Sequence, residues 1–90
     1  MATKVLPEAG TSKYVMEPWN VILLNDDYHG FDEVIIQLIK ATGCTQDQAA
    51  KIAWDVHNLG EAVCYSGPKE RCEHVAAILE EIKLKVRLDR

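Results

Sequence analysis

Residues 19–31 read Trp-Asn-Val-Ile-Leu-Leu-Asn-Asp-Asp-Tyr-His-Gly-Phe, and this stretch decides the fold. Its first six residues are β-prone and mostly apolar, so Trp19–Leu24 is predicted to form a short strand. The strand stops at Asn25. Asn and Asp favour turns because their side chains hydrogen-bond to nearby backbone. From Phe31 onward the apolar residues recur with helical spacing, so a strand leads through a polar turn into a helix.

The predicted first helix is amphipathic and is followed closely by a second. The apolar positions of the first helix recur three and four residues apart, at Phe31, Val34, Ile35, Leu38 and Ile39. Gly43 is suited to end this helix, because a helix C-terminus often needs a left-handed residue. Thr45 and Gln48 have the spacing of a capping box, which predicts the start of the second helix. Gly60 is expected to end it.

The remaining residues predict two more strands and one more helix. Glu61–Tyr65 is the second strand, and Pro68 is placed at the first position of the third helix, behind a cap. Leu84, Val86 and Leu88 alternate with basic residues, which indicates an edge strand. The prediction is an α+β fold in the order β-α-α-β-α-β, with a three-stranded antiparallel sheet packed against three helices. Residues 19–90 are expected to form this single small domain, and residues 1–18 are expected to form a flexible N-terminal arm.

Composition excludes several functions. A net charge of −4 without a Lys/Arg cluster argues against nucleic acid. The apolar runs are far shorter than the ~20 residues of a membrane span, and the N-terminus does not resemble a secretory signal. The odd set Cys44, Cys64 and Cys72 lacks a CxxC motif. We therefore expect free thiols in a reducing compartment, the cytoplasm, with no metal site.

A group of polar residues is the candidate site. Asn25, Asp26 and Asp27 place an amide and two carboxylates at the end of a buried strand, and His57 lies on the second helix. They could be a capped turn and an ordinary histidine, or a carboxylate–imidazole pair for acid–base chemistry. A small hydrolase or metal protein using Asp26, Asp27 and His57 is one alternative. However, no nucleophile motif or phosphate-binding glycine loop is present, so we expect neither an enzyme nor a cofactor.

Two sequence blocks together resemble the ClpS family of protease adaptors. Residues 21–28 read Val-Ile-Leu-Leu-Asn-Asp-Asp-Tyr, and residues 56–62 read Val-His-x-x-Gly-x-Ala, with the spacing of the family and no gap between them. The resemblance covers about residues 19–89. It implies an adaptor that binds N-degrons, which are proteins with a free α-amino group and a bulky apolar first residue. It also implies delivery to a Clp AAA+ chaperone, of the ClpA or ClpC type, with ClpP.

The resemblance assigns roles to individual residues. The α-amino group would be bound by Asn25 and His57, with Asp26 and Asp27 adding negative potential. The pocket for the first side chain would be lined by His29, Phe31, Val34, Ala53, Val56 and Leu84. Glu70 would contact the chaperone, and the N-terminal arm would assist substrate transfer. An α-amino group has a pKa of about 7.7–8.0, so burying its charged form requires acceptors of this kind.

The sequence departs from the family at the pocket. Many relatives have Met where this chain has Ala53, and commoner members have Thr-Pro-Met where it has His29, Gly30 and Phe31. Either the pocket is wider and admits β-branched first residues, or Phe31 or Trp54 fills the space. Val75 also replaces a family Lys on the chaperone side. A further alternative is an interaction domain related to the C-terminal domain of the ribosomal stalk protein, without N-degron specificity.

Overall fold

The computed structural model describes residues 18–90, and its elements confirm the predicted order. The predicted arm falls almost wholly outside these residues, so it stays a prediction. The elements are β1 (Trp19–Leu24), α1 (Phe31–Thr42), α2 (Gln46–Leu59), β2 (Glu61–Gly67), α3 (Lys69–Glu80) and β3 (Val86–Asp89).

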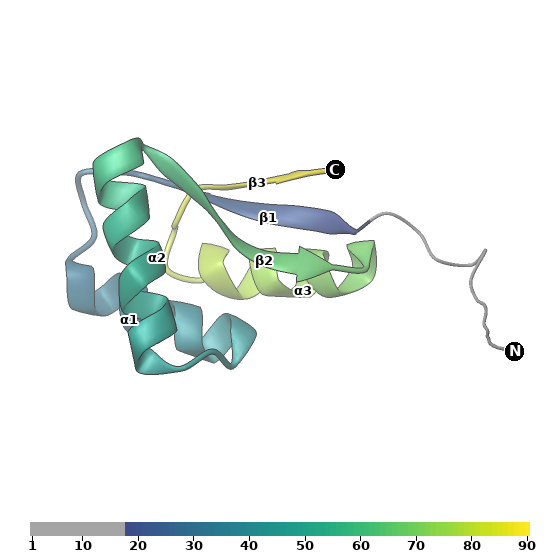
Figure 1. The fold of residues 1–90 in the computed structure, drawn as a ribbon, viewed down its shortest axis with the longest axis horizontal. Coiled ribbons are helices and arrows are strands. Elements are labelled where there is room, and N and C mark those ends of the chain that lie inside the picture. Colours follow the sequence, from purple (N-terminus) through teal and green to yellow (C-terminus); the bar gives the residue numbers. More distant parts are fainter. Residues whose placement is uncertain (1–17) are drawn as a thin grey trace, which may run out of the picture.

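The sheet is antiparallel with β1 in its centre and the strand order β2-β1-β3. Figure 1 shows α3 running along one face of the sheet, with α1 and α2 gathered at the end where β1 finishes. β1 and β2 slip by one residue, because Val21 faces Tyr65 whereas Ile22 faces Val63. Cys64 is the extra residue of this bulge, and it points into the core. Because β1 lies between the other two strands, it is the central strand, and β2 and β3 are the edges of the sheet.

The helix ends follow the predicted signals. Gly43 and Gly60 have φ angles of 75° and 90°, and their N–H groups donate to Ile39 and Val56 carbonyls. Only glycine adopts such angles without a steric penalty. Both hydrogen bonds of the capping box between Thr45 and Gln48 are present, at 3.1 and 3.0 Å. These local signals fix the lengths of α1 and α2, and hence the place where α2 ends beside β1.

Three boundaries differ from the predictions. Pro68 has a ψ of 150°, so it caps α3 from outside, and the helix begins one residue later than predicted. β2 continues to Gly67, because Ser66 and Gly67 pair with Asn20 and Trp19 of the central strand. Leu84 is buried but precedes β3 instead of lying in it.

Burial disfavours the thiolate form of two of the cysteines. Burial raises the pKa of the Cys64 thiol to about 12, and it also raises the pKa of Cys72. The three cysteines are free thiols, as expected. Within residues 18–90, no helix combines the length and the apolar character needed to cross a membrane.

Candidate binding cavity at the end of the central strand

A cavity of about 70 Å³ opens where β1 ends. A water needs only ~10–15 Å³ on this measure, so there is room for several heavy atoms. The wall comes from four segments: the end of β1 with its following loop, the start of α1, the second half of α2 and the turn before β3. The lining residues are Leu23, Leu24, Asn25, Asp26, His29, Phe31, Val34, Ala53, Val56, His57 and Leu84.

The structure brings nine of the predicted site residues together around this cavity and leaves two outside it. Asp27 lies in the same loop, but its side chain is exposed and does not line the wall. Glu70 is exposed in the first turn of α3, next to Pro68, Arg71 and His74. Figure 1 shows that this end of α3 lies at the opposite end of the domain from the end of β1, where the cavity opens.

Helical spacing and one backbone bond assemble the wall. Ala53, Val56 and His57 stand three and four residues apart, so they share one face of α2. The Asn25 N–H donates to the Gly60 carbonyl at 2.9 Å, which holds the end of β1 against the C-terminus of α2. Asn25 and His57 consequently line the same cavity, although 32 positions separate them in the sequence.

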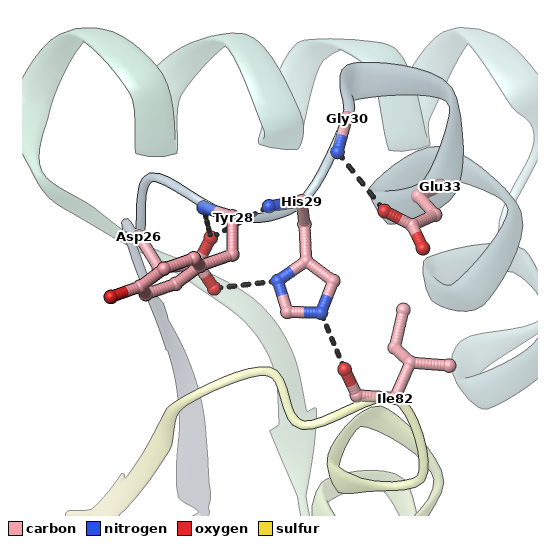
Figure 2. A network of polar contacts seen from close by, with 6 residues as sticks. All are labelled: Asp26, Tyr28, His29, Gly30, Glu33 and Ile82. Atoms are coloured by element: carbon pink, nitrogen blue, oxygen red, sulfur yellow. Dashed lines mark hydrogen bonds and ion pairs between the residues drawn. The ribbon is translucent and has the colours of Figure 1, made fainter.

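The loop after β1 is organised by the carboxylate of Asp26. Its Oδ1 accepts the N–H groups of Tyr28 and His29 at 2.9 and 3.0 Å, and its Oδ2 lies 2.7 Å from Nδ1 of His29. Figure 2 shows this network, with the other ring nitrogen of His29 directed at the Ile82 carbonyl. At the far side of the loop, the Gly30 N–H donates to Glu33 at 3.0 Å, at the start of α1.

These contacts shift two pKa values in opposite directions. The contact with the Ile82 carbonyl, followed by that with Asp26, raises the pKa of His29 above its ordinary value. Burial alone would raise the pKa of Asp26, but the donors Tyr28 N–H, His29 N–H and the imidazole outweigh it, so the net shift is downward. The pair is thus favoured as carboxylate and imidazolium.

Trp54 contacts both Phe31 and His57, an arrangement that the sequence analysis did not predict although it named Phe31 and Trp54 as residues that could fill the pocket. The Trp54 ring stacks on His57 with centroids 5.9 Å apart and a 14° angle between the planes. Phe31 and Trp54 form a T-shaped pair with ring centroids 5.4 Å apart. The spacing of Trp54 and His57, three apart on α2, was the available signal. Trp54 is 57% exposed and does not line the cavity, whereas Phe31 does.

The wall combines polar groups with an apolar side. Asn25 and His57 face the cavity, and no group within residues 18–90 hydrogen-bonds to their side chains, so an amide oxygen and an imidazole nitrogen stay open to a ligand. Phe31, Val34, Val56 and Leu84 supply the apolar side. The lining contains no Ser, Thr, Cys or Lys, and the described residues hold no group of three or more potential metal ligands.

Comparisons with known proteins agree on one family. The family model for the ATP-dependent Clp protease adaptor protein ClpS matches residues 15–87. A ClpS adapter of Thermosynechococcus vestitus is 38% identical over 56 residues, 61% of this chain and 60% of the relative. A ClpS adapter of Nostoc sp. is 36% identical over 75 residues, 80% of this chain and 77% of the relative. Several of the other matches span only half to three fifths of the length of the curated relative.

A solved structure gives the same answer for the fold. Agrobacterium tumefaciens ClpS2 bound to L-phenylalaninamide superposes with a TM-score of 0.76, over 81% of this chain and 95% of that chain. The sequence identity is 22%, so this likeness concerns the fold alone. The family match covers most of the chain and agrees with the two sequence blocks and the architecture. The chain belongs to the ClpS family.

Proposed function

We propose that this protein is a non-catalytic cytoplasmic adaptor that binds the N-terminal residue of N-degron proteins and delivers them to a Clp AAA+ chaperone–protease. The carrying observation is the cavity, which places Asn25 and His57 beside an apolar wall. A protein N-terminus is complementary to this arrangement, because its first α-carbon carries both an ammonium group and a side chain. The L-phenylalaninamide of the A. tumefaciens relative also combines a free amine with an apolar ring.

The α-ammonium group is proposed to donate to the Asn25 amide oxygen and to a neutral His57 nitrogen. The Asp26 oxygens are already engaged by the loop, so Asp26 contributes through its charge and by shaping the loop. The exposed carboxylate of Asp27 adds negative potential at the mouth. This division of roles explains why the loop carries two adjacent acids that are in different environments.

The energies suit a reversible adaptor. Burying a Leu- or Phe-sized side chain contributes about 1.5–3 kcal/mol. Each charge-assisted hydrogen bond to the ammonium group contributes about 1.5–3 kcal/mol. With the costs of association, these contributions are compatible with a total near −8 kcal/mol, which is a micromolar Kd. Such a complex captures substrates and still releases them to a partner.

Acetylating the substrate amine is expected to weaken binding strongly. A fluorescent peptide beginning with Phe should bind with micromolar affinity. Its N-acetylated form should bind about 100-fold more weakly, because two charge-assisted hydrogen bonds are lost. Fluorescence anisotropy measures the affinity of the free peptide and its loss on acetylation. The same measurement is made with peptides beginning with Phe, Leu, Trp, Tyr, Ile, Val and Asp. Equal affinities of the free and acetylated peptides would reject the proposal.

Delivery is proposed to use the opposite end of the domain. Glu70, in the first turn of α3 and outside the cavity wall, is the proposed chaperone contact there, so one chain can hold a substrate and dock at the same time. The test adds the purified chain to a ClpA- or ClpC-type chaperone with ClpP and a folded Phe-first substrate. Degradation should accelerate for this substrate and not for an otherwise identical substrate that begins with Met. An equal effect on both substrates would contradict N-terminal selection.

Ala53→Met is expected to narrow the range of first residues. Ala53 is 4% exposed and lines the cavity, while Trp54 stays outside it, so the space left by the small side chain belongs to the ligand. We expect the natural chain to bind Ile- and Val-first peptides within about tenfold of Leu-first peptides. The longer Met should weaken the β-branched group about tenfold, because overpacking costs ~1–3 kcal/mol.

Ala50→Met is the matched control for this change. Ala50 lies on the same helix, beside Lys51 and Trp54 and outside the cavity wall. The same anisotropy panel should give unchanged preferences for this variant. If the natural chain already rejects Ile and Val as strongly as the Ala53→Met variant does, the open-pocket interpretation is wrong.

A further inference from the structure

His29 has an acceptor at each of its two ring nitrogens. Nδ1 lies 2.7 Å from Oδ2 of Asp26, and Nε2 contacts the Ile82 carbonyl oxygen, as Figure 2 shows. A neutral imidazole carries only one N–H, so it can donate to only one of them and would point a lone pair at the other. Only the imidazolium form donates to both. The geometry therefore selects the charged ring.

The contacts of His29 connect two segments that both build the cavity. Asp26 belongs to the loop that carries Asn25, and Ile82 belongs to the turn that leads to Leu84. Within this turn Lys83 has a φ of 66°, a left-handed angle that is unfavourable for a residue with a side chain. The turn thus benefits from being held from outside, and 53 positions separate His29 from Ile82.

The contacts of His29 with Asp26 and with the Ile82 carbonyl, called the bridge below, are largely but not completely buried. The side chain of Asp26 is 6% exposed and that of His29 is 12% exposed, so a charge placed here is only partly screened. An uncompensated charge at this depth would be costly, whereas the carboxylate and the imidazolium neutralise each other. Protonation of His29 is accordingly coupled to the order of the loop and of the turn.

We propose that His29 is a positioning residue whose protonated ring ties the Asn25–Gly30 loop to the Ile82–Leu84 turn and so makes substrate affinity depend on pH. The proposal rests on the proposed function for its effect on affinity, but not for the existence of the bridge. Deprotonation leaves the Asn25 side and the Leu84 side of the cavity less firmly connected. His29 itself keeps no N–H free for the substrate.

The charges around the ring favour this form. In addition to the Ile82 carbonyl, Asp26 in the same loop and Glu33 at the start of α1 both raise the pKa of His29. From the C-terminal side, Glu81, Lys83 and Lys85 face the same surface hollow as His29. The two lysines oppose the ring charge from exposed positions, and Glu81 pairs with Lys40 at 2.9 Å. Across the cavity stands His57.

The sign of the pH effect on stability follows from both shifts. Asp26 has a lowered pKa, so its contribution is complete above the ordinary value of 3.8 and is lost as the pH falls. His29 has a raised pKa, so its contribution is complete below 6.5 and is lost as the pH rises through the folded-state value. The bridge therefore stabilises the chain fully between about pH 4 and 6.5.

Nitrogen NMR of the full chain tests the bridge directly. At pH 6.5 a two-bond proton–nitrogen correlation spectrum should show both ring nitrogens of His29 protonated, with a titration midpoint above that of a short peptide of residues 24–32. An Asp26→Asn variant should lower this midpoint. A single protonated nitrogen at pH 6.5, or a midpoint equal to that of the peptide, would overturn the proposal even without any variant.

Peptide binding then tests the effect on the site. The affinity of the natural chain for a free-amine Phe-first peptide is divided by that of the His29→Gln variant from pH 6 to 9. The ratio is expected to be about tenfold at pH 6 and close to one at pH 9, because the ring contacts are charge-assisted only in the acid range. Titration of the peptide amine affects both proteins and cancels in the ratio. His74→Gln, a surface histidine on α3, should give a ratio near one throughout.

The two possible failures can be told apart. A ratio that does not change with pH would overturn the positioning role of His29. Failure of the natural chain to bind the peptide at any pH would reject the proposed function and, with it, the effect of His29 on affinity. In that case the nitrogen spectra still decide whether the bridge exists.

Discussion

Replacing either Asn25 or His57 with alanine is expected to weaken binding of a free-amine Phe-first peptide about tenfold or more. Each side chain faces the cavity without a hydrogen-bond partner within residues 18–90, so each loss removes one proposed contact to the ammonium group. A hydrogen bond to a charged group contributes about 1.5–3 kcal/mol, and 1.4 kcal/mol is tenfold in Kd. Fluorescence anisotropy at pH 7 measures the change.

The chain offers matched controls for both residue types. Asn58→Ala and His74→Ala change an exposed asparagine and an exposed histidine that do not line the cavity. Both control proteins should bind as the natural chain does. If Asn25→Ala and His57→Ala bind normally while remaining folded, the substrate amine is held elsewhere and the proposed site is wrong.

Leu79→Ala is expected to destabilise the fold by about 2–5 kcal/mol. Leu79 is completely buried on α3, the helix that lies along the sheet, and it belongs to the same core cluster as Val21, Leu23 and Leu38. Truncation leaves a void among groups that cannot collapse fully. A domain of this kind has ~5–15 kcal/mol of total stability, so the loss is severe. Urea unfolding followed by circular dichroism measures it.

Leu59→Ala is the control with the same chemical change. Leu59 is 73% exposed at the end of α2, and a surface truncation should stay within about 0.5 kcal/mol. Comparable losses for the two variants would show that the core is packed differently from the structure described here. Peptide affinity per folded molecule should be unchanged in Leu79→Ala, because the residue does not line the cavity.

Local signals in the sequence were sufficient to predict the elements. Gly43 and Gly60 end their helices through left-handed angles that neighbouring residues cannot adopt cheaply, and Thr45 starts α2 through its own side chain. Pro68 was misplaced by one residue because a proline fits both the cap and the first helical position, and only its ψ angle decides between them. Boundaries of this kind depend on backbone geometry and not on composition.

The residues that line the cavity could be predicted only through the resemblance to the family. The resemblance supplied Asn25 and His57 as partners, although nothing local in the sequence connects them. The contact of His29 with the Ile82 carbonyl could not be foreseen, because it joins positions 53 residues apart through a backbone atom that every residue type possesses. Leu84 was predicted to line the pocket, but it reaches the cavity from a turn and not from the predicted strand.

The cavity wall is shared among four segments, and this has a thermodynamic consequence. An unfolded chain keeps these segments apart and so cannot offer the same site, which means that any ligand of the cavity must favour the folded state. Linkage gives the size of the effect: a ligand at 100 times its Kd raises the free energy of unfolding by about 2.7 kcal/mol. The melting temperature of this small domain is consequently a label-free scale on which candidate ligands of the cavity can be ranked.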